Sequence, residues 1–211
     1  MVFCLFFTLS IACFAEPLPK EQLYQKLDLE QRGLSKKAFD LAVRGFEKLL
    51  AQGQLMNSTV LSIVDFSLPS SQKRLFVINL ISQELIFYDY VAHGKNSGTT
   101  IAKSFSNKMN SLKSSLGFFV TKNTYNGKNG LSLELDGKEK GINDHALERS
   151  VVIHGAPYVN EHFAKQKYGM GRSWGCPAVP EKINKSLIET IKDGSCFFIY
   201  APVYKKESAS W

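Results

Sequence analysis

The sequence GRSWGCPAVP, residues 171–180, places one cysteine between a glycine and a proline. Such a concentration of glycine and proline is typical of a loop, not of a regular helix or strand. A structural thiol usually occupies an apolar run, where it packs as a small hydrophobic side chain. Cys176 on a glycine-flanked loop is suited to three other roles: half of a disulfide, a metal ligand or a nucleophile. The rest of the chain has to distinguish them.

Length and composition indicate a globular protein. The chain has 211 residues, of which 44% are hydrophobic and 21% are charged. That length suffices for one sizeable domain, or for a domain with a small appendage. The composition argues against a disordered or fibrous chain. The sequence also contains no internal repeat or low-complexity tract.

The first fifteen residues, MVFCLFFTLSIACFA, contain no charged side chain. This run is too short to span a bilayer comfortably and resembles the apolar region of a secretory signal peptide. Cys13 and Ala15 have the small side chains and the spacing that a signal peptidase recognises, so we expect cleavage after Ala15. Acylation of Cys13, as in a lipoprotein, is the alternative and the one route to membrane anchoring. We expect an exported protein of the bacterial periplasm or cell envelope.

The net charge of +7 lies entirely outside these fifteen residues. A basic exported protein has anionic envelope material as a natural partner. We expect no nucleic-acid partner, because no basic stripe is interleaved with aromatic residues. A lysine-rich surface that only keeps the protein soluble explains the charge equally well.

Two cysteines, Cys176 and Cys196, remain after the predicted cleavage. In an oxidising compartment, two cysteines are open to forming a disulfide. Cys196 begins the apolar run CFFIYAPV, which favours an inert thiol in a core strand. Spacing alone does not exclude the bridge, so the disulfide stays open at this point.

Residues 20–52 have a helical pattern. Ser35 is a candidate N-cap, apolar residues then recur every three or four positions, and Gly53 ends the pattern. We assign residues 16–56 to an N-terminal helical appendage that packs on the main domain through its apolar stripe. A stripe of this kind is far more often a packing surface than a functional site.

From about Val60 the hydrophobic period becomes two, and short runs rich in β-branched and aromatic residues follow. These runs are RLFVINL, ELIFYDYVA, LGFFVTKNTY, LSLEL, SVVIHG and CFFIYAP. The first two form a predicted hairpin over 74–92, and one late helix is predicted over 181–192. Residues 57–211 are therefore predicted to form a mostly β sandwich or barrel.

The run SVVIHG sets His154 at the end of an apolar strand, immediately before Gly155. Rigid scaffolds present functional side chains where strands pass into loops. A cysteine and a histidine that folding brings together form a nucleophile and its base: the imidazole takes the thiol proton, and the thiolate attacks a carbonyl. We expect an adjacent imidazolium to lower the pKa of Cys176 below about 7.

The neighbours of this cysteine constrain where an oxyanion could bind. Gly175 permits backbone conformations closed to other residues and leaves room for a substrate. Pro177 has no N–H and cannot supply a donor from the following position. An oxyanion hole is therefore expected from the amides of Trp174, Gly175 or Cys176, with the hydroxyl of Ser173 as a further candidate.

The combination His-Gly, seventeen residues, then Ser-Trp-Gly-Cys resembles the signature of the L,D-transpeptidase (YkuD-like) catalytic domain family. The likeness extends upstream and is similar to a divergent murein L,D-transpeptidase subfamily over residues 71–203. The segments that carry it are VAHGKNSG (91–98), FSN (105–107), SSLGFF (114–119), YNGKNGLSL (125–133) and GINDHALERSVVIHGA (141–156).

This resemblance implies a β-sandwich-like catalytic domain that acts on peptidoglycan stem peptides. The cysteine would attack the carbonyl of the third stem residue and expel the terminal D-amino acid. The side-chain amine of a neighbouring diaminopimelate would then resolve the thioester. By this resemblance Cys176 is the nucleophile and His154 the base, Gly155 shapes the histidine loop, and Ser173 and Gly175 shape the cysteine loop.

One position departs from the family pattern. Ala178 stands where the main family usually has an arginine, so we consider Arg172 as a substitute cation beside the substrate. His93, in the first His-Gly, would line the cleft or simply close a hairpin. A zinc site formed by His93, His154 and Cys176 lacks a closely spaced ligand pair. We expect no metal and no cofactor.

The leading functional prediction is a cysteine-dependent transpeptidase that cross-links or remodels peptidoglycan. The first alternative is a hydrolase with the same thioester chemistry, such as an L,D-carboxypeptidase, endopeptidase or amidase. The second is a non-catalytic wall-binding module held by a disulfide between Cys176 and Cys196. Acceptor-site shape separates the first two, and the state of the thiols tests the third.

Overall fold

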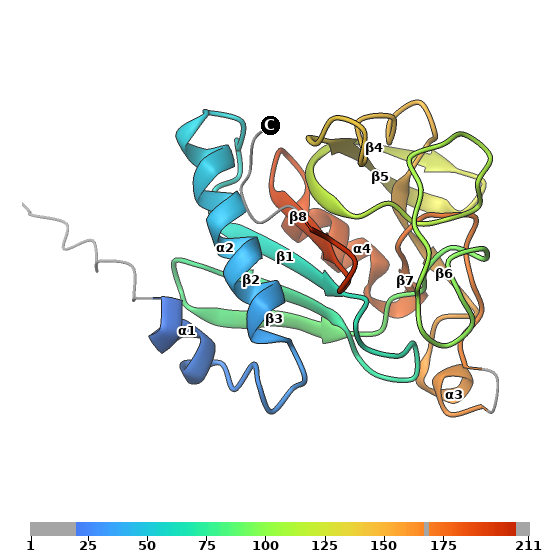
Figure 1. Ribbon diagram of the computed structural model, residues 1–211, viewed down its shortest axis with the longest axis horizontal. Helices are drawn as coiled ribbons and strands as arrows, with labels where there is room; N and C mark the ends of the chain where they lie inside the picture. Colours follow the sequence, from blue (N-terminus) through green and yellow to red (C-terminus); the bar gives the residue numbers. More distant parts are fainter. Residues whose placement is uncertain (1–19, 167–168, 206–211) are drawn as a thin grey trace, which may run out of the picture.

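The computed structural model describes residues 20–166 and 169–205, which form one eight-stranded sheet with helices packed on it (Figure 1). The strands are β1 (Val60–Asp65), β2 (Leu75–Asn79), β3 (Glu84–Asp89), β4 (Gly117–Gly127), β5 (Gly130–Gly137), β6 (Val152–Ala156), β7 (Ala178–Pro180) and β8 (Cys196–Tyr200). The helices are α1 (Lys20–Lys26), α2 (Lys36–Ala51), α3 (Glu161–Ala164) and α4 (Glu181–Ile191). The predicted signal peptide, with Cys13 and Ala15, lies outside the described residues.

The sheet curls until its two edges meet. Its strand order is β3-β2-β1-β8-β4-β5-β6-β7, with β1–β8 and β6–β7 parallel and the other neighbours antiparallel. Just after the edge strand β3, the amide of Ala92 donates a hydrogen bond of 2.8 Å to the carbonyl of Ala178 in the opposite edge strand β7. The sheet is therefore a nearly closed barrel, which confirms the predicted mostly β class.

The N-terminal helices pack on this barrel. Ser35 caps α2 as predicted, because its Oγ accepts a hydrogen bond of 3.2 Å from the amide of Ala38. Gly53, with φ of +66°, follows the helix end. The apolar face of α2 contacts β1 and β8, and its buried residues belong to the same core cluster as the strands. At Gly45 a Cβ would lie 2.0 Å from the ring of Phe118 in β4, so glycine lets the helix approach the sheet.

The predicted hairpin is formed by β2 and β3, and the predicted late helix is α4. The predicted runs did not include two of the strands: β1 and β7, a three-residue strand directly after the cysteine loop. Proline lies at both ends of this segment, and proline normally argues against a strand interior. Long-range pairing with β6 forms the strand nevertheless.

Among the described residues, no helix is long and apolar enough to cross a membrane.

Candidate active site

The parallel pairing of β6 and β7 brings the loop that carries the predicted nucleophile, just before β7, next to β6, which carries the predicted base. His154 in β6 is the register partner of Ala178, and Cys176 precedes Ala178 by two residues. The same register sets Cys176 beside Val152, whose amide faces the thiol. The Sγ atom lies 3.6 Å from the carbonyl oxygen of Ser150, at the start of the same segment. The register thus places Cys176 two positions from the partner of His154, on neighbouring segments of the fold.

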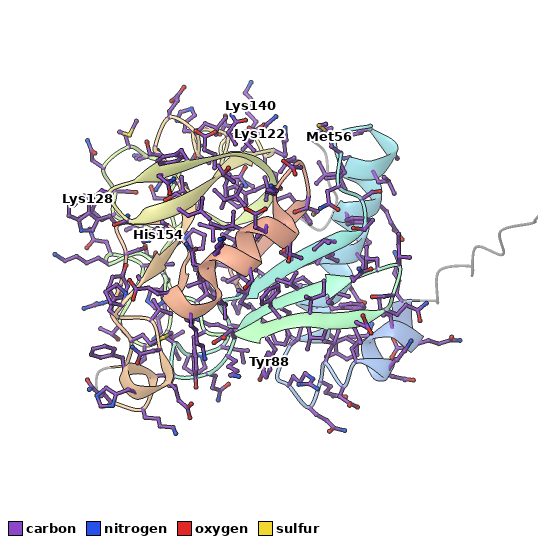
Figure 2. The ribbon with its side chains drawn as sticks, turned by 180° about the vertical axis from the view of Figure 1, so that it is seen from behind. Met56, Tyr88, Lys122, Lys128, Lys140 and His154 are labelled. Atoms are coloured by element: carbon purple, nitrogen blue, oxygen red, sulfur yellow. The ribbon has the colours of Figure 1, made fainter. Side chains whose placement is uncertain are left out.

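The imidazole of His154 is buried, with 4% of the residue exposed, and lies in β6 (Figure 2). Its Nδ1 atom is 2.9 Å from the carbonyl oxygen of Gly155. Since a carbonyl can only accept, Nδ1 carries the proton and Nε2 keeps a free lone pair. Burial also lowers the pKa of His154 below its ordinary value, only partly offset by this hydrogen bond. The ring is therefore a neutral base at neutral pH.

The thiol of Cys176 is also neutral in this state. Burial raises its pKa, and the amide of Val152 and the charge of Arg149 offset that effect only in part. The prediction that His154 lowers the thiol pKa below about 7 is wrong for the resting site. Desolvation disfavours both the thiolate and the imidazolium, so the pair rests as thiol and imidazole.

Gly175 has the backbone conformation that its loop demands. Its φ is +138°, and a Cβ there would lie 2.9 Å from the carbonyl oxygen of Lys113. The hydroxyl of Ser173 accepts a 3.1 Å hydrogen bond from the amide of Gly175 and donates one of 2.6 Å to the carbonyl of Cys176. Ser173 and the Gly175 amide are therefore engaged inside the loop. The amides of Trp174 and Cys176 remain as candidate oxyanion donors.

Two other predicted loop residues face different surroundings. The side chain of Trp174 turns outward, 74% exposed, with Lys128 Nζ 5.9 Å from its ring centre. Gly155 faces α4, where a Cβ would lie 3.2 Å from the Cβ of Asn184. Gly155 thus allows close packing of α4 on β6 beneath the histidine.

His93 does not line the cleft. It is fully buried, and its Nδ1 accepts a hydrogen bond of 2.8 Å from Nη2 of Arg74. Burial and the charge of Arg74 lower the pKa of His93 to about 4. The carbonyl of His93 accepts a 3.0 Å hydrogen bond from the amide of Ser173. The structure therefore corrects the substrate-binding prediction: His93 supports the cysteine loop from behind.

Arg172, predicted as a cation beside the substrate, is exposed. Its Nη1 atom donates a 3.1 Å hydrogen bond to the carbonyl of Gly98. The cation whose charge stabilises the Cys176 thiolate is Arg149. No sequence pattern marked Arg149 as a site residue, although it lies in the segment 141–156 that carries the family resemblance.

The guanidinium of Arg149 ties together the loop that lies against Gly175. It donates hydrogen bonds of 2.7 Å to the carbonyls of Ser106 and Lys113, and it also contacts the hydroxyls of Ser111 and Ser115. Lys113 is the residue whose carbonyl limits the space at Gly175. Arg149 therefore both fixes the wall of the cysteine loop and places a positive charge near the thiol.

Tyr158 is a second neighbour that sequence analysis did not reveal. Burial and then the proximity of Cys176 raise the pKa of its hydroxyl to about 12. The phenol is therefore protonated across the neutral range, so its hydroxyl can act there as a hydrogen-bond donor.

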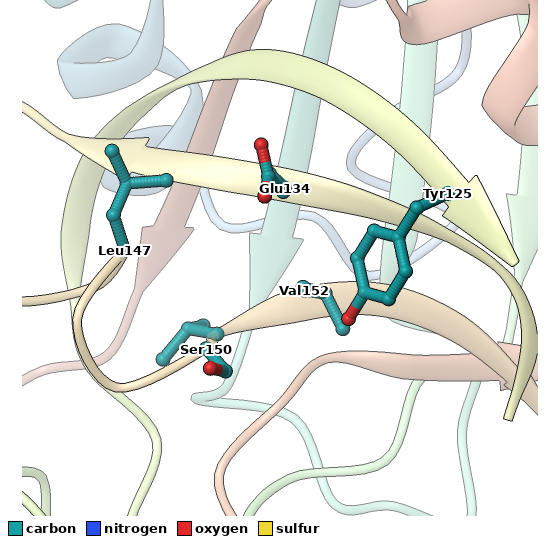
Figure 3. Close-up of a pocket in the computed structure, with 6 residues that line it drawn as sticks. Tyr125, Glu134, Leu147, Ser150 and Val152 are labelled. Carbon is teal, nitrogen blue, oxygen red and sulfur yellow. The ribbon is translucent and has the colours of Figure 1, made fainter. Parts of the chain in front are cut away.

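A cavity of about 220 Å³ is formed by residues of β4, β5, β6 and the segment before β6 (Figure 3). Its lining residues are Tyr125, Glu134, Leu147, Ser150, Val151 and Val152. Ser150 and Val152 also contact the thiol, so the cavity and the nucleophile share a wall. No sequence pattern marked this cavity, because its residues come from three separate segments.

Both cysteines in the described part of the chain are free thiols. Cys196 is buried in β8, where burial strongly raises its pKa. The predicted alternative of a disulfide between Cys176 and Cys196 is therefore wrong. Within residues 20–166 and 169–205, no group of three or more His, Cys, Asp or Glu side chains is arranged to hold a metal ion.

Several solved structures are similar to part of this chain. An L,D-transpeptidase from Mycobacterium smegmatis matches at 14% identity and a TM-score of 0.41, over 68% of this chain and 59% of that one. The helical cell shape determining protein Pgp2 from Campylobacter jejuni matches at 14% identity and a TM-score of 0.44, over 66% and 47%. Bd1075 from Bdellovibrio bacteriovorus matches at 16% identity and a TM-score of 0.42, over 67% and 48%. The aligned region thus spans about half the length of each of these proteins.

No curated protein matches the chain. A family model does match, however: the model described as the L,D-transpeptidase catalytic domain aligns with residues 30–200, from the segment before α2 to the end of β8. Because this match covers far more than half of the sequence, the protein belongs to the L,D-transpeptidase catalytic domain family.

Proposed function

We propose that this protein is an exported bacterial L,D-transpeptidase that joins peptidoglycan stem peptides through a thioester on Cys176. Sγ attacks the carbonyl carbon of the third stem residue while Nε2 of His154 takes the thiol proton. The C–N bond then breaks, and the terminal D-amino acid leaves as an amine with the proton that His154 returns. The side-chain amine of a diaminopimelate on a second stem attacks the thioester, and the thiol is released.

One observation carries this proposal: the tautomer of His154. The hydrogen bond from Nδ1 to the Gly155 carbonyl fixes the proton on that nitrogen and keeps Nε2 as the acceptor. Burial keeps the ring neutral at physiological pH by lowering its pKa. General-base activation requires a neutral imidazole near a protonated thiol, and His154 lies next to the loop that carries the Cys176 thiol.

The surroundings of Cys176 support thiolate formation during the reaction and not before it. Arg149 and the amide of Val152 favour the negative charge, whereas burial opposes it. The thiol would therefore ionise as His154 accepts its proton and a substrate carbonyl receives the electron pair. The amides of Trp174 and Cys176 are the donors we assign to the resulting oxyanion.

Tetrapeptide muropeptides incubated with the purified protein test the reaction type. A transpeptidase yields cross-linked dimers, whereas a hydrolase yields tripeptide monomers. Cys176→Ala should abolish both products while leaving the thermal unfolding midpoint unchanged. A Cys176→Ala protein with wild-type turnover would overturn the proposal.

Export rests on the uncharged residues 1–15. Intact mass of the protein from a cell-envelope fraction should correspond to residues 16–211. A lipidated chain that begins at Cys13 would replace this proposal by the lipoprotein alternative.

A further inference from the structure

The catalytic histidine shares one face of the sheet with an acidic side chain. His154 is the register partner of Ser132, and Val152 is the register partner of Glu134. Directly paired residues project to the same face, and so do residues two apart on one strand. Tyr125 of β4 joins this face as the partner of Ser132. Glu134 and Tyr125 line the cavity on this face (Figure 3), and the strand register places His154 on the same face.

The cavity on this face shares two of its lining residues with the surroundings of the thiol. Ser150 and Val152 line the cavity, and the Ser150 carbonyl and the Val152 amide contact Sγ of Cys176. A group bound in the cavity is therefore a near neighbour of an acyl group carried on that sulfur. The cavity of about 220 Å³ is large enough for a short side chain and too small for a whole stem peptide.

Glu134 gives this cavity a negative charge in a basic protein. Within residues 20–166 and 169–205, its carboxylate has no ion-pair partner, and its Oε2 accepts a 3.2 Å hydrogen bond from Nδ2 of Asn123. One side-chain amide leaves most of the acceptor capacity of a carboxylate unused. The remaining wall includes the apolar side chains of Leu147 and Val152. A carboxylate with apolar neighbours suits a primary ammonium on an aliphatic chain.

We propose that the cavity around Glu134 is the subsite for the ammonium-bearing side chain of the acceptor, and this inference rests on the proposed function. Glu134 binds the cationic end and concentrates the acceptor beside the thioester. Leu147 and Val152 contact its methylene groups, and Tyr125 covers the outer side. Glu134 is thus a binding residue that determines whether an amine or water attacks the thioester.

The reaction at this subsite balances without a further reactant. The ammonium gives up one proton to solvent as it leaves Glu134, and the neutral amine nitrogen bonds to the acyl carbon. The C–S bond breaks and its electron pair goes to Sγ of Cys176. The nitrogen loses a second proton to His154, which passes it to the sulfur. The products are an amide cross-link and the free thiol.

The test measures how the acyl-enzyme partitions between aminolysis and hydrolysis. Wild-type, Glu134→Gln and Glu134→Asp proteins are acylated with a stem tetrapeptide, and a diaminopimelate-bearing tripeptide is added as acceptor over a range of concentrations. Glu134→Gln should raise the acceptor concentration for half-maximal cross-linking by about tenfold, as loss of one charge-assisted contact predicts. Glu134→Asp keeps the charge and should lie closer to wild type.

Two controls give the result its meaning. Glu148→Gln removes the same charge from an exposed position on the neighbouring turn and should not alter the partition. Hydroxylamine is largely uncharged near neutral pH, so its aminolysis should be the same in wild type and Glu134→Gln. The unfolding midpoint and the rate of acylation report whether Glu134→Gln keeps its fold and its nucleophile.

The outcomes separate this inference from the proposed function. If wild-type protein forms no acyl-enzyme, the proposed function fails. If the acyl-enzyme forms and Glu134→Gln matches wild type in its use of the tripeptide acceptor, the subsite assignment is overturned. An equal loss with hydroxylamine would also overturn it, because that result would indicate a distorted thioester instead of a missing charge.

Discussion

Replacement of Arg149 by methionine removes the group that fixes the wall of the cysteine loop. The strongest interactions that the substitution removes are the two 2.7 Å hydrogen bonds to the carbonyls of Ser106 and Lys113. Each hydrogen bond to a charged donor is worth about 1.5–3 kcal/mol when buried, and the partial exposure of Arg149 puts each at the low end or below. We expect Arg149→Met to lower the free energy of unfolding by about 2 kcal/mol, measured by urea denaturation.

The same substitution should change the chemistry of the thiol. The charge of Arg149 favours the Cys176 thiolate, so its removal should raise an already elevated thiol pKa further. Iodoacetamide alkylation of Cys176, followed against pH, should therefore shift to higher pH in Arg149→Met. Arg149→Lys keeps the charge without the planar fork, and should lose stability while largely keeping the alkylation profile.

Arg172→Met is the matched control for these measurements. Arg172 bonds the carbonyl of Gly98 instead, so its loss should leave the alkylation curve of Cys176 in place. A curve that is identical in wild type and Arg149→Met would refute the role of Arg149 at the thiol. A shift in Arg172→Met equal to that in Arg149→Met would refute it as well.

Three further predictions concern the cysteine loop, the base His154 and the buried His93. In Gly175→Ala, residue 175 must adopt φ of +138° with its Cβ 2.9 Å from the Lys113 carbonyl oxygen, so the substitution should lower the free energy of unfolding by about 1–3 kcal/mol and the acylation rate at least about a hundredfold. Pro177→Ala removes no hydrogen-bond donor, so its acylation rate should stay within about tenfold of wild type. Equal acylation rates for the two variants would contradict this prediction. On the acid side, the acylation rate should reach half its maximum at a pH below 6.5, because burial lowers the pKa of His154 from that value and the ring stays neutral. A half-maximal rate at a pH above 6.5 would count against His154 as the base. Because the pKa of His93 is about 4 when folded and 6.5 when unfolded, the unfolded chain binds more protons between these values, and the free energy of unfolding should fall by about 3 kcal/mol as pH drops from 6.5 to 4. His93→Gln, which can still accept from Arg74, should lose that part of the dependence on pH in denaturation experiments.

Local signals in the sequence were sufficient for much of the fold. Ser35 followed by a helical apolar stripe predicted α2, and the runs with a period of two predicted all strands of the sheet except β1 and β7. The strand β7 escaped prediction because its three residues have no pattern of their own. Its backbone is ordered by pairing with β6 and with Ala92, contacts that span many residues in sequence.

The candidate site, like the fold, could be predicted from the sequence only in part. Motif spacing marked Cys176 and His154 as candidates, and the structure places Cys176 in the loop before β7, next to the strand β6 that carries His154. Their ionisation did not follow, since it depends on burial that a motif does not encode. Arg149 bonds loop residues distant in sequence, and Glu134 lines a cavity formed by three segments, so no local pattern marked either residue.

The central claim is that Cys176 carries the stem peptide as a thioester formed with the help of His154. Intact-mass spectrometry of the protein mixed with a stem tetrapeptide, followed by peptide mapping, tests it directly. We predict an increase equal to the donor without its terminal D-amino acid, located on Cys176, absent in Cys176→Ala and slowed by about 10²–10⁴-fold in His154→Ala. An adduct on Cys196, or turnover by the Cys176→Ala protein at the wild-type rate, would contradict the claim.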